Sequence, residues 1–270
     1  MNDLLTFQGN GLSLRVRDTG GTGMPVVFQH GLCGDIHQPY DVFPRSDRFR
    51  LITVECRGHG ESEAGDPGQF SIATFAEDIL AYLKSADIAH YVVGGISMGA
   101  AIALRIACMN PQAVTGLILA RPAWGMDSAP VNMRPNTLVG MLLEEFGSAR
   151  GLEIFEGSST AKHLAEVAPD NLASLRGFFT RKPESITEEL LQRISTDGPG
   201  VAKMDIARLT MPILVIGHGR DAVHPLALAK DLAALLPTAR LCEITPKALS
   251  KTQYATEFTA ALNDFLEGLQ

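Results

Sequence analysis

The chain of 270 residues (29.0 kDa) is long enough for one large α/β domain with an insertion or for two small domains. Its 46% of apolar residues, 20% of charged residues and mean hydropathy of +0.10 exclude an intrinsically disordered chain. The formal charge is −7 and no basic run stands out, so nucleic acid is not expected as a partner. The four cysteines lack a C-x-x-C pair or zinc-like spacing, which indicates reduced thiols and no metal site.

No part of the sequence resembles a secretory signal or a membrane span. The first residues lack a positively charged segment followed by an apolar stretch. No window stays apolar over the ~20 residues that a membrane helix needs, since even residues 94–109 include Arg105. We therefore expect a soluble, cytoplasmic protein without a membrane partner.

Short apolar runs alternate with helical periodicity along the chain. An alternating run over residues 12–17 leads into the turn-rich segment 18–23, which predicts an antiparallel opening hairpin. The later runs are unbroken, as in strands that are covered on both faces. These runs span residues 26–28, 51–54, 91–93, 114–119, 213–216 and 241–244, and helices with one apolar stripe lie between them, as at 72–83 and 254–269. The pattern predicts an α/β fold with a mainly parallel, twisted sheet of about eight strands flanked by helices.

Residues 121–210 differ from the rest because they contain several helical stretches and no convincing strand. One helix is expected to begin at the capping box formed by Ser185 and Glu188. Repeated prolines predict several short helices rather than one long helix. We interpret residues 121–210 as an inserted helical cap, or lid, on an α/β core formed by residues 1–120 and 211–270.

The sequence GISMG at residues 95–99 matches the pattern G-x-S-x-G, follows the apolar run 91–93 and opens an Ala-rich helical stretch. A sharp strand-to-helix turn at this place exposes the hydroxyl of Ser97 at the carboxyl edge of the sheet. The amide of Met98, at the start of the helix, then points toward an anion that forms beside the serine. We predict that Ser97 is a nucleophile, and the alternative is a glycine-rich turn before a buried helix.

The sequence HGLCG at residues 30–34 follows the run 26–28, and this loop can aim the amide of Leu32 into the same space. The amides of Leu32 and Met98 are therefore predicted to form an oxyanion hole. We expect His30 to brace the loop rather than to exchange protons. Cys33, beside the loop, is chemically able to act as a nucleophile, but we interpret it as a small buried thiol.

With these motifs the chain resembles the α/β-hydrolase family over nearly its whole length. The resemblance includes the loop 30–34, the sequence RGHGES at 57–62, the turn at Ser97, a lid between two late strands, and the sequence GHGRDAVHP at 217–225. In detail the chain is similar to small bacterial esterases, enol-lactonases and C–C bond hydrolases with a helical cap. The resemblance implies that His59 belongs to a structural loop and that Asp221 is the catalytic acid. The alternative for Asp221 is a residue stabilised by the dipole of the helix that begins near Pro225.

The family pattern also implies a catalytic histidine after the last strand, and the chain has none at that place. The loop reads TPKALSK over residues 245–251, and no histidine follows His224. A serine hydroxyl is a poor nucleophile without a base beside it. We prefer His224 as the base, with His37 as a second candidate, although His224 stands at a helix start where a histidine can also cap or pack.

Two further explanations remain open at this point. A lysine, Lys247 or Lys251, serves as the base if burial lowers its pKa, although lysines beside a solvent-facing helix are usually charged surface. Otherwise the triad has decayed, and the protein is a non-hydrolytic lyase or a small-molecule binding protein on the same fold.

The substrate pocket is expected between the sheet edge and the lid, and we expect it to be mainly apolar. Cys33, His37, Arg121 and Trp124 are candidate pocket residues, with Arg121 able to reach an anionic group. The aromatic and methionine side chains expected nearby are those of Trp124, Met126, Met133, Met141, Phe146, Phe155, Phe178 and Phe179, most of them as lid core. The sequence predicts a serine hydrolase that needs no cofactor and acts on a small, largely apolar ester, lactone or related carbonyl compound.

Overall fold

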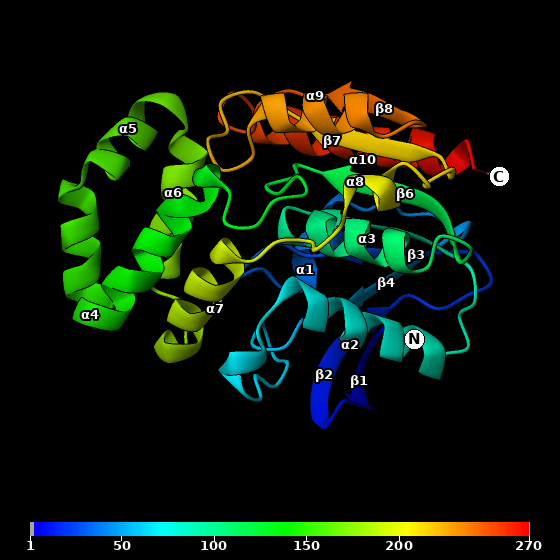
Figure 1. Cartoon of the computed structure of the whole chain (residues 1–270), viewed down its shortest axis with the longest axis horizontal. Helices are drawn as coiled ribbons and strands as arrows, with labels where there is room; N and C mark the ends of the chain where they lie inside the picture. Colours follow the sequence, from blue (N-terminus) through cyan, green and yellow to red (C-terminus); the bar gives the residue numbers. More distant parts are fainter. Residues whose placement is uncertain (1–2, 270) are drawn as a thin grey trace.

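The computed structural model describes residues 3–269, and its centre is one eight-stranded sheet in the order β1-β2-β4-β3-β5-β6-β7-β8 (Figure 1). The strands are β1 (Leu4–Gly9), β2 (Leu12–Asp18), β3 (Met24–Gln29), β4 (Phe49–Val54), β5 (Tyr91–Ile96), β6 (Val114–Ala120), β7 (Ile213–Gly217) and β8 (Ala239–Glu243). β1 and β2 form an antiparallel hairpin, and β2 pairs antiparallel with β4. All pairs from β4 to β8 are parallel, so the carboxyl ends of β3 to β8 meet at one edge.

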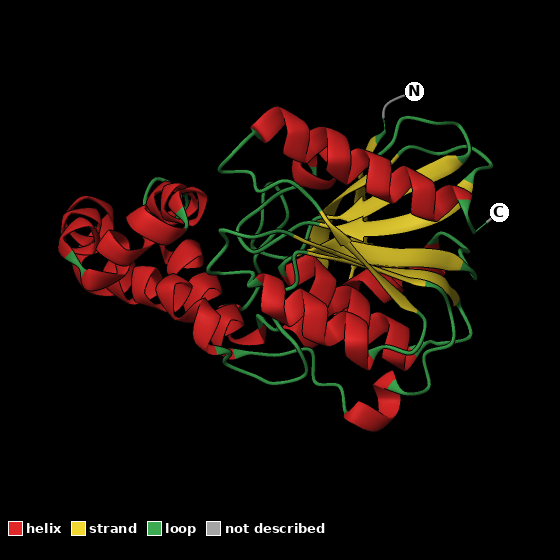
Figure 2. Ribbon diagram, turned by 90° about the horizontal axis from the view of Figure 1, so that it is seen from above, coloured by secondary structure: helices red, strands yellow, loops and turns green. Residues whose placement is uncertain are grey.

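Helices cover both faces of the sheet, as Figure 2 shows. They are α1 (His37–Val42), α2 (Ile72–Ser85), α3 (Met98–Met109), α9 (Leu226–Leu235) and α10 (Lys251–Glu267). Successive strand residues point to opposite faces: Val27 packs in the cluster with α2 and α3, whereas Val26 and Phe28 pack in the cluster with α10. Strands buried on both sides explain the unbroken apolar runs in the sequence.

The segment between β6 and β7 contains helices and no strand among its residues, all of which the structure describes. The helices are α4 (Arg134–Gly157), α5 (Ser159–Val167), α6 (Pro169–Phe178), α7 (Glu184–Thr196) and α8 (Lys203–Ile206), and a 3-10 turn, η2 (Val131–Met133), precedes α4. Another 3-10 turn, η1 (Pro67–Gln69), lies before α2. Helices α4 to α7 form a group to one side of the sheet (Figures 1 and 2). Prolines stand at the starts of α4, α6 and α7, as expected from the missing N–H of proline.

The fold class predicted from the sequence is confirmed: the sheet is mainly parallel, has eight strands and begins with the antiparallel hairpin. One local prediction was wrong. Helix α7 begins at Glu184 with Pro183 as its N-cap, so Ser185 lies inside the first turn and does not cap the helix. Among residues 3–269, no helix is both long and apolar enough to span a membrane.

Candidate active site

Ser97 lies on the tight turn between β5 and α3, and its backbone is strained. Its φ of 58° and ψ of −112° lie in a region that L-residues rarely adopt. The turn is possible because its two glycines carry no side chain. A Cβ on Gly95 would lie 2.5 Å from the backbone of Gly99, and one on Gly99 would lie 2.4 Å from the carbonyl oxygen of Gln29. The close packing of strand, turn and helix therefore requires glycine at both positions.

The loop after β3 lies directly against this turn. Its amide at Gly31 donates to Oε1 of Gln38 at 2.6 Å, and the amide of Gly34 donates to the carbonyl of Gly31 at 2.9 Å. A Cβ placed on Gly31 would lie 3.4 Å from Cβ of Ser97, which shows how close the two segments are. Leu32 stands in the middle of this loop, and Leu32 and Ser97 line the same cavity.

A histidine and a carboxylate complete a hydrogen-bonded chain from Ser97. Nε2 of His224 lies 2.8 Å from Oγ of Ser97, and Nδ1 of His224 lies 2.9 Å from Oδ1 of Asp221. A carboxylate only accepts hydrogen bonds, so Nδ1 carries the proton and Nε2 is left to accept the Ser97 hydroxyl proton. Both residues come from the loop between β7 and α9, where Asp221 also accepts the backbone amide of His224 at 2.9 Å. The chain therefore presents acid and histidine from one loop after β7.

Arg121 holds the other side of the carboxylate. Its Nε and Nη2 both donate to Oδ2 of Asp221, at 3.0 and 2.7 Å. Burial opposes the ionisation of Asp221, but His224 and Arg121 outweigh it, so the pKa of Asp221 lies well below its usual value. Burial, with a contribution from the Arg121 charge, also lowers the pKa of His224, although Asp221 opposes this. His224 is therefore neutral at neutral pH, the state that a general base needs.

Asn171, on α6, forms a bridge to the same loop that the sequence analysis did not foresee. Its Nδ2 donates to Oδ1 of Asp221 at 2.9 Å, and its Oδ1 accepts the amides of Ala222 and Val223 at 2.6 and 3.1 Å. The side chain is buried, with 4% of its surface exposed. No local sequence signal marks it, because the contact joins residues 50 positions apart.

A cavity of about 450 Å³ opens above Ser97 and His224, between the sheet edge and helix α6. Both apolar and charged side chains line it. Among the apolar lid side chains expected there, Phe178 lines the cavity, whereas Trp124, Met133, Phe155 and Phe179 are packed in the core. Cationic side chains line it instead, namely those of Arg121, Arg181 and Lys247, together with one carboxylate, Asp170.

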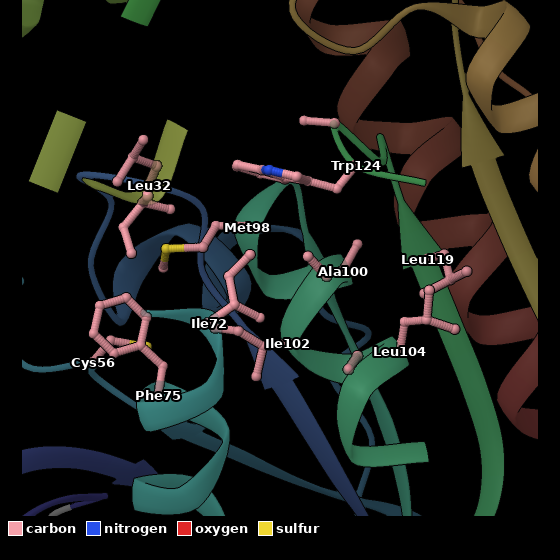
Figure 3. Close-up of a cluster of buried hydrophobic side chains, with 14 of the residues drawn as sticks. Leu32, Cys56, Ile72, Phe75, Met98, Ala100, Ile102, Leu104, Leu119 and Trp124 are labelled. Carbon is pink, nitrogen blue, oxygen red and sulfur yellow. The ribbon is translucent and has the colours of Figure 1, made fainter. Parts of the chain in front are cut away.

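Two of the four candidate pocket residues line this cavity and two do not. Cys33 and Arg121 are lining residues. Trp124 is not, because its ring is buried with Leu32 and Met98 in the hydrophobic cluster of Figure 3 and its Nε1 donates to the carbonyl of Asp197 at 3.0 Å. His37 is exposed at the start of α1 and lines a neighbouring hollow whose lining does not include Ser97.

The other histidines and lysines of the region have contacts that differ from those of His224. His30 is buried, its Nε2 accepts the amide of Cys56 at 3.0 Å, and burial lowers its pKa to about 4, in keeping with a bracing role. His59 is also buried and packs edge-on against Phe75. Lys247 lines the cavity at the place where the family pattern has its histidine, and Lys251 is exposed at the start of α10. Within residues 3–269 no group of histidine, cysteine and acidic side chains is arranged to hold a metal ion.

Comparison with known proteins agrees with this architecture. A family model described as the alpha/beta hydrolase fold matches residues 24–248. A Mycobacterium tuberculosis protein assigned as a non-heme bromoperoxidase, BpoC, is 30% identical over 236 residues, which are 84% of this chain and 87% of that protein. The chain therefore belongs to the alpha/beta hydrolase fold family.

Solved structures show the same fold at low sequence identity. The enol-lactonase from Burkholderia xenovorans LB400 superposes with a TM-score of 0.75 and 22% identity, over 97% of this chain and all of that chain. A thermophilic esterase from Thermogutta terrifontis gives a TM-score of 0.72 and 22% identity over 98% of both chains. At this level of identity the likeness concerns the fold alone.

Proposed function

We propose that the protein is a serine hydrolase that cleaves a small ester, lactone or related carbonyl compound through an acyl-enzyme. Ser97 is the nucleophile, His224 the general base and Asp221 the acid that orients it. The observation that carries the proposal is the chain of contacts from Oγ of Ser97 through the imidazole of His224 to the carboxylate of Asp221, at 2.8 and 2.9 Å. These are the distances at which a base can take a hydroxyl proton.

The proposed reaction begins when Oγ of Ser97 attacks the substrate carbonyl carbon and its proton passes to Nε2 of His224. The negative charge that develops on the carbonyl oxygen is held by the amides of Leu32 and Met98. Collapse of this intermediate expels the leaving group, which takes the proton from His224. Water then attacks the acyl-enzyme with the same base, releases the acid product and restores Ser97.

Asp221 contributes by holding the tautomer and orientation of His224, and Arg121 and Asn171 support this arrangement because they bind the remaining lone pairs of the carboxylate. The Arg121 charge has an additional effect. It lies close to the ring, with Nη2 3.1 Å from Nδ1 of His224, and it disfavours the protonated imidazolium. We therefore propose a base that is weaker than in a triad without this cation and that works at lower pH.

A fluorophosphonate probe tests the proposal, because it reacts covalently with an activated serine. We expect mass spectrometry to find the adduct on Ser97, and we expect Ser97→Ala to lose both labelling and hydrolysis of 4-nitrophenyl esters. An unlabelled Ser97, together with unchanged hydrolysis in Ser97→Ala, would refute it. If the wild-type protein is not labelled and cleaves none of these esters, the result favours the alternative, a non-hydrolytic lyase or a binding protein with a decayed triad. The enol-lactonase and esterase neighbours suggest lactones and short-chain esters as the first substrates to assay.

A further inference from the structure

The cavity above Ser97 is lined by more cationic than anionic side chains, and their contacts indicate which cation is available to a substrate. Arg121, Arg181 and Lys247 line it, and Asp170 is the one carboxylate among its lining residues. Two of the three cations have a negative charge near them. Arg121 forms a two-pronged ion pair with Asp221 beneath the cavity, and the charge of Asp170 acts on Lys247.

Arg181, which follows helix α6, differs because both of its Nη atoms bond to neutral acceptors. Nη1 donates to Oγ1 of Thr187 at 3.0 Å, and Nη2 donates to the carbonyl oxygen of Gly58 at 2.7 Å. No acidic side chain in residues 3–269 forms an ion pair with it. The two bonds fix the orientation of the guanidinium but leave its charge without a counter-charge, in a site that is partly shielded from water.

The Arg181 charge lies on the side of the cavity formed by the loop 30–34. Burial raises the pKa of the Cys33 thiol, and the Arg181 charge opposes this rise. Burial lowers the pKa of His30, and the Arg181 charge lowers it further. Cys33 follows Leu32, whose amide is proposed to hold the carbonyl oxygen of the substrate. Arg181, Leu32 and Cys33 all line the cavity, so a group bound to Arg181 shares the cavity with the reacting carbonyl.

We propose that Arg181 binds a carboxylate of the substrate, so that the preferred substrates are small esters or lactones bearing one carboxylate. The inference rests on the proposed function of Ser97, and it replaces the largely apolar substrate expected from the sequence. A carboxylate matches the planar fork of a guanidinium, and its single charge balances the single charge of Arg181.

The test uses two esters that differ in one group. 4-Nitrophenyl hexanoate and mono-4-nitrophenyl adipate have acyl chains of similar length, and the second ends in a carboxylate where the first ends in a methyl group. We expect the protein to prefer the adipate ester in kcat/KM by about tenfold or more, the size of effect given by one charge-assisted hydrogen bond. We expect Arg181→Gln to remove most of this preference, chiefly through KM, and Arg181→Lys to keep part of it.

Arg176→Gln is the matched control, because Arg176 is an exposed arginine of α6 that pairs with Glu156. It should change neither the rates nor the preference. The proposal is wrong if the wild-type protein does not prefer the adipate ester, or if Arg181→Gln slows both esters equally, since Arg181 would then only hold the lid to Gly58. Loss of the preference in Lys247→Gln but not in Arg181→Gln would also overturn it. Failure of the proposed function looks different: neither ester is cleaved and Ser97 is not labelled.

Discussion

Replacing Asn171 by alanine tests whether the inserted helices take part in building the catalytic loop. The change removes one hydrogen bond to the carboxylate of Asp221 and two from the amides of Ala222 and Val223. A hydrogen bond to a charged group contributes about 1.5–3 kcal/mol, and each buried group left without a partner costs about 1–3 kcal/mol. Since water can enter the space and bind part of these groups, we expect a loss of about 2–4 kcal/mol in the free energy of unfolding.

The same variant should affect catalysis more than substrate binding. If loss of the hydrogen bond to Asp221 raises the free energy of the transition state more than that of the enzyme–substrate complex, kcat falls about 10- to 100-fold, while KM changes little. The assay is steady-state hydrolysis of a 4-nitrophenyl ester, with thermal unfolding measured on the same samples. Arg176→Ala, exposed on the same helix, should change neither quantity. A normal kcat in a destabilised Asn171→Ala protein would refute the reasoning, because Asn171 would then serve stability alone.

Three further predictions concern the base and the turn. Because burial lowers the pKa of His224 and the base must be neutral, kcat/KM should rise with pH through an inflection below about 6.5 and stay high above it. Arg121→Gln should move this inflection to higher pH, because the Arg121 charge contributes to the lowered pKa. An inflection above pH 7 in the wild-type protein would contradict this reasoning. Ser97→Gly should abolish hydrolysis yet raise the free energy of unfolding by about 1 kcal/mol, since glycine adopts a φ of 58° without strain, and a lower melting temperature would contradict this. Gly99→Ala should destabilise the protein by about 1–3 kcal/mol or more, measured by denaturant unfolding, because its Cβ would meet the carbonyl oxygen of Gln29, and an unchanged midpoint would show that the turn can relax.

The sequence was most informative where the signal is local. Apolar runs marked the strands, because strands buried on both faces need them along their whole length. The glycines around Ser97 marked the turn, because only glycine lets strand, turn and helix approach so closely. The absence of a histidine after the last strand narrowed the candidate bases, and among them His224 is the one whose ring lies within hydrogen-bond distance of Ser97.

Contacts between distant segments could not be predicted in this way. Asn171 contacts Asp221 because α6 packs over the sheet edge. No sequence motif around either residue predicts this contact. The particular side chains that line the pocket were also hard to predict. A stripe of apolar residues on a helix shows that the helix packs against something but not against what, and Phe155 of α4 packs into the core. Arg181, in the loop after α6, lines the cavity without any local sequence signal that marks it.

In the proposed mechanism an imidazole three residues after the acid, rather than one after the last strand, activates Ser97. Its most direct test is the rate at which a fluorophosphonate modifies Ser97 in His224→Gln, followed by mass spectrometry alongside the wild-type protein and Lys247→Ala. The account predicts that modification slows by a factor on the order of 10³ or more in His224→Gln and stays near the wild-type rate in Lys247→Ala. Modification of His224→Gln at the wild-type rate, or its loss in Lys247→Ala alone, would contradict the account.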